Sequence, residues 1–410
     1  MALQRLRRVL EANYRVRIES SDQLLTRVNL QVEKRRQALQ TKGKPIPVFK
    51  TGSVVDALQP ERNWSIRAID LLHKIGFLTT PKGVNMARLS ASWATRRYFW
   101  AIGDPVVQDP NLRLSDDARR MDFHQKTLLS DEFGIGMAGL LMEGFFQAGS
   151  FVDISIALND PAAYQDIERE GDAQPDYLMW SEADNSPYYV VECKGTQCNR
   201  GESYNQLRRG LEQVPSVVLG AGPRQVVTMV VATCLLDSGT DIFVLDPPPD
   251  KPDDNYPGKE SEKVSERTGK RSWRIRNHEA FQERTLIAEE SNLLKWAGQY
   301  QTANIRDRRL ERVQPELLEM RNAPLENKET NVGVFRGIEQ PLFPELGARN
   351  LRLFTGVEEG LLESFMQEPQ RVQPDARHVE RRRLQREPPE HLPFNTSVSR
   401  TGSCMIIEGL

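Results

Sequence analysis

An apolar run in the sequence ends in a charged triplet. Residues 188–197 read YYVVECKGTQ, so a segment typical of a buried strand finishes with Glu192, Cys193 and Lys194. Side chains alternate along a strand, so Glu192 and Lys194 should point to the same side, about 7 Å apart, with Cys193 pointing to the other. A buried acid and amine are costly unless something compensates for their charges. A divalent cation such as Mg²⁺, which prefers oxygen ligands, would provide that compensation.

A second carboxylate is available earlier in the chain. Asp176 opens the short strand PDYLMW, and the turn-rich stretch SEADNSP separates it from 188–197. A hairpin through that turn would bring Asp176 beside Glu192. We therefore expect these two acids to hold the metal, with Lys194 beside the attacking water. Such a site suits in-line attack of water on a phosphodiester, because the metal activates water and neutralises the developing charge.

The surrounding segments predict a mixed α/β core. Their expected order is a helix at 133–147, strands at 151–158, 175–180 and 188–194, a helix at 203–214 and a strand at 225–232. The last strand lies within RQVVTMVVATCLL, whose continuous apolar character indicates burial on both faces of a sheet.

This order, with PD at 175–176 and ECK at 192–194, resembles the restriction-endonuclease-like superfamily, the PD-(D/E)xK nucleases. The resemblance covers residues 130–246 and implies an αβββαβ core whose acids bind Mg²⁺, with Mn²⁺ as a substitute. It also implies that the lysine polarises the attacking water. VECKGTQ followed by a QLRRG helix is likewise similar to uncharacterised bacterial nuclease-like proteins. The exonuclease branch has a Tyr where this chain has Gly210, so that motif is not carried over.

The resemblance also implies a further acid on the first helix. Glu132 in SDEFGIG is the better candidate, and Glu143 is the alternative. The helix dipole alone favours an acid in a first turn, so Glu132 has a purely structural explanation too. We count Cys193 among the metal-binding positions, although its side chain is expected to pack in the core as a small apolar group.

Basic residues outside the core are candidates for nucleic-acid contact. KRSWRIRNH at 270–278 predicts a strand with arginines on one face, and its candidates are Arg271, Arg274 and Arg276. Such a strand suits contact with a phosphate backbone. Arg208 and Arg209, in the helix at 203–214, are further candidates, although an ordinary polar helix face explains them as well.

Composition limits the class of protein. A hydrophobic fraction of 39% excludes general disorder, and a net charge of -2 excludes a global basic field, so any nucleic-acid surface must be local. Four cysteines are too few for a disulfide framework. No apolar stretch approaches the roughly 20 residues of a membrane span, and the first residues lack the apolar region of a signal peptide. We expect a cytoplasmic protein without membrane contact.

The chain divides into four predicted parts. They are a mainly helical region at 1–125, with helices expected at 1–40 and 63–77; the nuclease-like core at 126–246; a linker at 247–262; and a mainly helical region at 263–410 that includes an exposed polar segment. The boundary after 246 is DPPPDKPDDNYPGK, whose prolines exclude a helix or a central strand.

The predicted function is Mg²⁺-dependent endonucleolytic hydrolysis of DNA, and family analogy alone adds a role as a bacterial defence or restriction effector. RNA is an alternative substrate, because nothing in the motif excludes it. A catalytically silent nuclease fold that serves as an assembly scaffold is the other alternative. Taken singly, Asp176 could begin a turn, and Glu192 with Lys194 could form a solvated ion pair. The chain has one ExK element, so double-strand cutting would call for a homodimer or a partner assembly.

Overall fold

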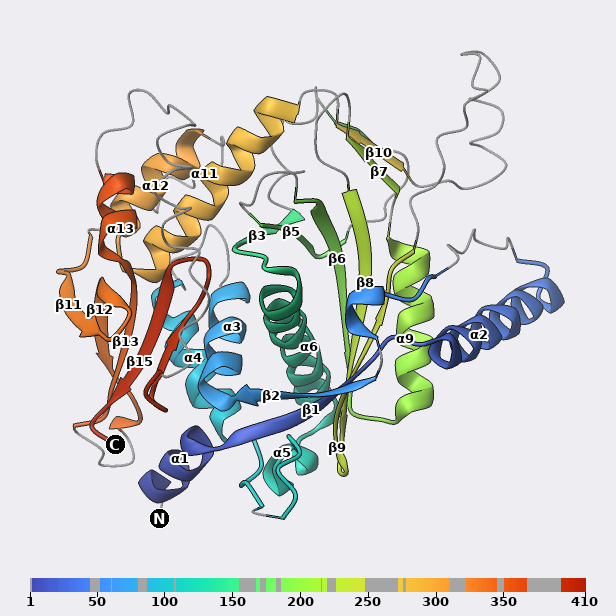
Figure 1. Ribbon diagram of the computed structural model, residues 1–410, viewed down its shortest axis with the longest axis horizontal. Coiled ribbons are helices and arrows are strands. Elements are labelled where there is room, and N and C mark those ends of the chain that lie inside the picture. The colour runs from blue at the N-terminus through green and yellow to red at the C-terminus, as the bar shows by residue number, and fades with distance from the viewer. Residues whose placement is uncertain are drawn as a thin grey trace.

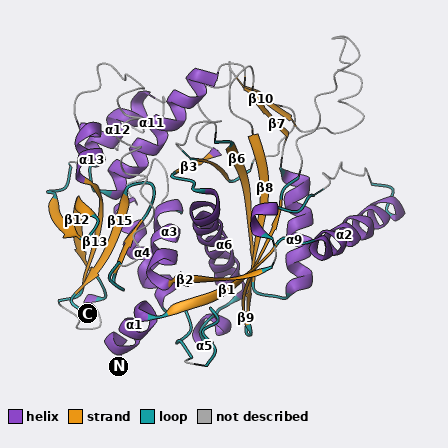
Figure 2. Ribbon diagram, viewed as in Figure 1, coloured by secondary structure: helices purple, strands orange, loops and turns teal. Residues whose placement is uncertain are grey.

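The computed structural model describes fifteen segments of the chain. They are residues 2–44, 52–59, 61–79, 87–106, 108–154, 167–169, 175–181, 186–214, 216–219, 226–247, 272–275, 278–309, 322–344, 350–366 and 392–410. A mixed seven-stranded sheet runs through the centre, in the order β2-β1-β9-β8-β6-β5-β3 (Figure 1). Helices cover it on both sides (Figure 2). The predicted α/β class is confirmed.

The middle of this sheet and its covering helices come mostly from residues 123–236, although β4 (Ile167–Arg169) and β7 (Ser216–Leu219) interrupt this stretch and belong to a separate small sheet. The central elements are α6 (Phe123–Phe146), β3 (Ser150–Asp153), β5 (Tyr177–Trp180), β6 (Tyr188–Thr196), α9 (Arg200–Gln213) and β8 (Val226–Leu236). β3, β5 and β6 are antiparallel neighbours, and β8 is parallel to β6. The predicted order of a helix, three strands, a helix and a strand is therefore present, as is the predicted hairpin of β5 and β6.

The N-terminal region adds strands that the sequence did not lead us to expect. β1 (Asn13–Glu19) separates α1 (Ala2–Glu11) from α2 (Asp22–Thr41), so the predicted helix at 1–40 is wrong there. Buried and more exposed side chains alternate along β1, whose buried residues include Tyr14, Val16 and Ile18. This period of two was not recognised in the sequence because leucines at helical spacing flank the strand on both sides. β2 (Arg62–Arg67) precedes α3 (Ala68–Leu78), so the helix predicted at 63–77 begins later. β1 joins the sheet in parallel with β9 (Gly239–Leu245).

Within its described residues, the C-terminal region contains a sheet as well as helices, whereas a mainly helical region was predicted. The helices among these described residues are α11 (His278–Trp296), α12 (Tyr300–Arg309) and α13 (Glu359–Met366). A five-stranded antiparallel sheet accompanies them, built from β11 (Glu326–Thr330), β12 (Gly333–Pro341), β13 (Arg352–Glu358), β14 (Thr396–Val398) and β15 (Ser403–Glu408). A small sheet of β4 (Ile167–Arg169), β10 (Ser272–Ile275) and β7 (Ser216–Leu219) is separate. Apart from residue 247, the predicted linker lies outside the described residues.

The two faces of the central sheet are covered by different helices. Val191 and Cys193 of β6 share a core cluster with Met137 of α6. On the other face, Val230 of β8 packs with Leu207 of α9, and α2 adds further apolar residues to that cluster. Burial on both faces explains why β8 is continuously apolar rather than alternating.

Glycines bring α6 unusually close to the end of β6. A Cβ atom on Gly195 would overlap the carbonyl oxygen of Ser130, and one on Gly134 would lie 2.8 Å from the carbonyl oxygen of Lys194. Any larger residue at these positions would separate the two backbones, because the atoms in the way belong to the main chain. The approach therefore fixes residues 130–134 of α6 against the strand that carries Glu192 and Lys194.

This contact predicts the effect of Gly195→Ala. The added methyl should push α6 away from β6 and lower the free energy of unfolding by about 1–3 kcal/mol, the usual cost of overpacking. Chemical denaturation followed by circular dichroism measures this.

Gly144→Ala on the same helix is the matched control, since its Cβ would meet Trp64 at an ordinary 3.5 Å. The control should leave stability unchanged or raise it, because Ala favours helix over Gly. Equal stability of Gly195→Ala and wild type would contradict the close approach.

Candidate active site

The β5–β6 hairpin brings the two predicted acids together. Its register pairs Tyr177 with Val191, and continuing it by one residue places Asp176 opposite Glu192. Side chains opposite each other on neighbouring strands have Cβ atoms about 4.5–5.5 Å apart. The Asp176 carboxylate is also anchored, because its Oδ2 accepts a hydrogen bond of 2.7 Å from the backbone N–H of Cys193.

Glu192 is buried with half of its carboxylate unsatisfied. It is 1% exposed, and its Oε1 forms an ion pair with Nζ of Lys194. Its Oε2 is buried and has no hydrogen-bond partner among the described residues. Alternation along β6 explains the burial, since Glu192 lies beside Val230 on the face that α9 covers. An unpartnered buried carboxylate oxygen is expensive and is a natural place for a cation to bind.

The electrostatics of the site disfavour two ionised carboxylates. Burial raises the pKa of Glu192 to about 7, and the charge of Asp176 adds to this against the opposing effect of Lys194. Burial likewise raises the pKa of Asp176, although Lys194 and the N–H of Cys193 counteract it. Burial alone would lower the pKa of Lys194, but the two carboxylates outweigh it and the pKa is raised. The lysine is therefore a cation, and the acids would be stabilised by a further positive charge.

Sequence reasoning missed one acid beside this group, Asp131 of α6. It is exposed at the surface of the helix, and its charge adds to the burial that raises the pKa of Asp176. Asp131 follows Ser130, whose carbonyl touches Gly195 at the end of β6, so the helix presents residue 131 to the site. SDEFG offers two adjacent acids, and only the contact with Gly195 shows which of them faces Lys194.

Glu132 has different neighbours. Burial raises its pKa, while Tyr98 and Arg97 of α4 (Ala87–Phe99) act to lower it. Tyr98 packs its ring against Phe133 of α6, which places α4 beside this part of the helix. Successive residues on a helix point about 100° apart, so Glu132 lies toward α4 when Asp131 lies toward the strand.

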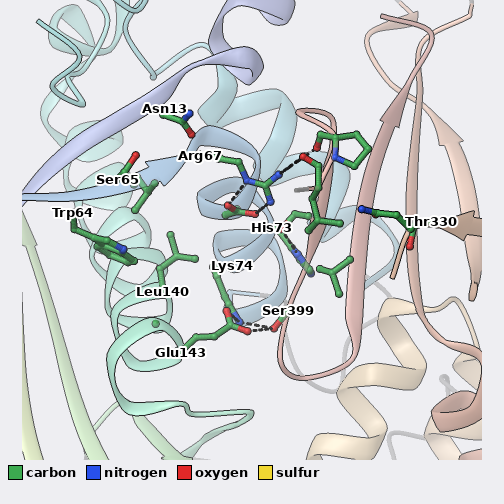
Figure 3. Close-up of a pocket in the computed structure, with 18 of the residues that line it drawn as sticks. Asn13, Trp64, Ser65, Arg67, His73, Lys74, Leu140, Glu143, Thr330 and Ser399 are labelled. Atoms are coloured by element: carbon green, nitrogen blue, oxygen red, sulfur yellow. Dashed lines mark hydrogen bonds and ion pairs between the residues drawn. The ribbon is translucent and has the colours of Figure 1, made fainter. Parts of the chain in front are cut away.

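The alternative acid Glu143 is remote from the site. It lies about 18 Å along α6 from Asp131, given the 1.5 Å rise per residue. There it forms an ion pair of 2.8 Å with Lys74 and accepts a hydrogen bond of 2.9 Å from Ser399 (Figure 3). The structure therefore does not bring Glu143 to the acid pair.

Glu143 lines a cavity of about 1150 Å³ between the core helices and the C-terminal sheet (Figure 3). Four of the ionic groups on its walls pair with one another, and Glu329 of β11 lines the cavity as well. Lys74 binds Glu143, and Arg67 binds both carboxylate oxygens of Asp70 at 2.8 and 2.6 Å. Because these charges are matched within the protein, they join α3, α6 and the loop after β14 rather than offering an unpaired charge to a ligand.

Cys193 does not offer a thiolate. Its side chain is buried on the α6 face, and burial raises the pKa of the thiol well above its usual range. A metal prefers the deprotonated sulfur, so the sulfur of Cys193 is a poor ligand here. The residue supports the site through its backbone N–H, which holds Asp176.

The predicted nucleic-acid contacts have different outcomes. Arg208 is buried and pairs with Glu212 on its own helix, so its guanidinium does not face solvent. Arg209 is exposed, with its NH1 3.8 Å from Glu202. The predicted strand at 270–278 is present in part as β10, which includes the backbone of Arg274. Arg271 and Arg276, and the side chain of Arg274, lie outside the described residues.

Comparisons with known proteins give no match: no family model fits the chain, and no curated protein and no solved structure is significantly similar to it. Over the described part of the chain, no group of three or more His, Cys, Asp and Glu side chains is placed to hold a metal ion. In the same residues, no helix is long and apolar enough to cross a bilayer. The site therefore rests on its own geometry, with the buried Glu192 and the partly buried Asp176 as its acids.

The raised pKa of Glu192 predicts how stability depends on pH without metal. The folded protein keeps the Glu192 proton up to about pH 7, whereas the unfolded chain loses it near pH 4.5. Between these values the folded state binds more protons, so rising pH costs stability. Glu192→Gln removes this dependence. In EDTA its stability relative to wild type should be higher at pH 8 than at pH 5.

Urea denaturation at both pH values measures the difference. Glu33→Gln on the exposed face of α2 is the control, because it changes one carboxylate at the surface. A stability difference between Glu192→Gln and wild type that does not vary with pH would contradict the raised pKa.

Proposed function

We propose that this chain is a divalent-metal-dependent nuclease that hydrolyses phosphodiester bonds of DNA. The observation that carries the proposal is the acid pair, in which Asp176 lies opposite Glu192 and Oε2 of Glu192 is buried without a partner. Lys194 lies beside it as a cation. Once β4 and β7 of the separate small sheet are set aside, α6, β3, β5, β6, α9 and β8 follow an αβββαβ order with β8 parallel to β6, which resembles the PD-(D/E)xK core and supports the proposal.

The donor set fits a hard divalent cation. Mg²⁺ is commonly bound through one or two carboxylates and keeps several waters, so it does not need a cluster of three protein ligands. Asp176 and Glu192 would hold it, and it would neutralise charge on the phosphate as a Lewis acid. Mn²⁺ has the same preference for carboxylate oxygen and would substitute.

Lys194 supplies the remaining chemistry of the chain. Its ammonium has three N–H donors, which can hold a water molecule and a phosphate oxygen at once. In hydrolysis the water oxygen forms a bond to phosphorus and the bond to the leaving ester oxygen breaks, which gives a phosphate monoester and an alcohol. Lys194 stabilises the negative charge that develops on the phosphate oxygens, and its pairing with Glu192 keeps it in position.

Two alternatives to DNA hydrolysis are retained, one in the substrate and one in the activity. RNA is the alternative substrate, because the site groups act on the phosphate that both nucleic acids share. A silent scaffold is the second, and it is favoured by the finding that the described residues contain no group of three or more side chains placed to hold a metal ion. A role in bacterial defence, and a homodimer or partner assembly for double-strand cutting, belong to the family analogy.

Lys194→Ala tests the activity directly. We expect the rate of cleavage to fall about 10²–10³-fold, because a charge-stabilising donor is lost. Cleavage of plasmid, linear DNA and RNA is measured with Mg²⁺, Mn²⁺ or EDTA, and circular dichroism checks the fold. Lys34→Ala, on the exposed side of α2, is the matched control and should cut like wild type. Cleavage by Lys194→Ala at the wild-type rate would rule out this site.

Metal binding is tested separately by thermal unfolding. A cation held by the acid pair binds only the folded state, so at 100 times its Kd it should stabilise the protein by about 2.7 kcal/mol. The double variant Asp176→Asn, Glu192→Gln should lose this shift in melting temperature. Asp237→Asn, an exposed acid, should keep it. Identical shifts in all three proteins would place the cation elsewhere and favour the scaffold.

A further inference from the structure

The described chain exposes two aromatic side chains among its large hydrophobic residues. Phe123 is 79% exposed and Trp93 is 56% exposed. Phe123 begins α6, the helix that carries Asp131, and Trp93 lies on α4, whose Arg97 and Tyr98 adjoin Glu132. Aromatic side chains contribute strongly to interfaces, so these two exposed rings are candidates for contact with a ligand.

The first turns of α6 lie at the rim of the candidate active site. Gln197, directly after β6, donates hydrogen bonds to the carbonyl oxygen of Lys126 at 2.9 Å and to Oγ of Ser130 at 3.0 Å. These bonds tie the N-terminal part of α6 to the end of the strand that carries Lys194. Phe123 lies about 12 Å along the helix from Asp131, and Leu128, 42% exposed, lies between them.

The second exposed ring is paired with an arginine. The guanidinium of Arg97 lies 5.6 Å from the ring centroid of Trp93 and 5.5 Å from that of Tyr98. Tyr98 is buried against Phe133 of α6, while Trp93 faces solvent one helical turn away from Arg97. α4 and α6 both pack on α3, which lies between them in Figure 1. The Trp93–Arg97 pair therefore combines an open aromatic face with a positive charge close to the acids of α6.

We propose that Phe123 and the Trp93–Arg97 pair are stacking platforms for unpaired bases of the substrate, so that the site acts on single-stranded or splayed DNA. The inference rests on the proposed nuclease function and names its substrate class. Bases stack on aromatic side chains whatever their sequence, and arginine adds cation–π and phosphate contacts. In a duplex the base faces are covered by neighbouring bases, so only unpaired nucleotides can use these rings. The acid pair would meet the phosphate while the rings hold the bases.

Binding is measured in the cleavage-silent Lys194→Ala background by fluorescence anisotropy in EDTA. The probes are a labelled oligo-dT strand, an abasic strand of equal length and a fully paired duplex. Phe123→Ala and Trp93→Ala should each weaken binding of oligo-dT by about 5- to 150-fold, the range for loss of one stacked base. Binding of the abasic strand and of the duplex should change little. Phe123→Tyr and Trp93→Phe should restore oligo-dT binding, because they keep a ring.

Leu30→Ala is the control, since Leu30 is 55% exposed on α2 and has no place in the proposed surface. Equal losses on oligo-dT and the abasic strand, no loss in either alanine variant, or no binding of oligo-dT at all would overturn the stacking proposal. The two proposals also fail separately. If oligo-dT binding depends on the rings but the wild type does not cleave in Mg²⁺ or Mn²⁺, the nuclease proposal is wrong and the stacking proposal stands. If cleavage is unchanged by loss of both rings, the stacking proposal is wrong and the nuclease proposal stands.

Discussion

The contact between α6 and the end of β6 is the constraint on which the candidate site depends. Gly195 and Gly134 remove the two Cβ atoms that would otherwise separate these backbones. The helix consequently presents Asp131 to the strand end, and Gln197 fastens the preceding turns. Without this approach, the acids of the hairpin and the acid of the helix would belong to separate surfaces. Two positions without side chains thus decide where several charged side chains meet.

The buried Glu192 gives the site its electrostatic character. A core position facing α9 would ordinarily hold an apolar residue such as Val230, which lies beside it in the sheet. A carboxylate there leaves one oxygen unsatisfied and raises its own pKa through burial. A residue that lowers stability within a core of otherwise apolar residues is typical of a functional position. Lys194 relieves part of this cost, which is why its position as the second residue after Glu192 matters.

Local patterns predicted the pairing of β5 with β6 and the order of the core elements, because the apolar runs there are separated by residues that are typical of turns. β1 was missed because its seven residues lie between two leucine-rich helices. The choice between Asp131 and Glu132 could not be read from the sequence, since the phase of α6 is set by its contact with Gly195. In contrast, the pairing of Arg208 with Glu212 was readable, because residues four apart on a helix are neighbours. The C-terminal sheet was underestimated because β13 and β14 lie far apart in the sequence, with α13 between them, so local patterns do not show that their strands share one sheet with β15.

The parallel pairing of β1 with β9 has a consequence for synthesis on the ribosome. Val16 lies opposite Thr240, so the sheet cannot be completed until more than half of the chain has been made. Contacts of such long sequence separation form slowly, because loop closure comes before any gain from pairing. The antiparallel pair of β1 and β2 must therefore wait, with one strand edge open, while the residues from α6 to β9 emerge. The nascent chain thus contains an incomplete sheet edge, which is where chaperone binding or mispairing between chains would begin.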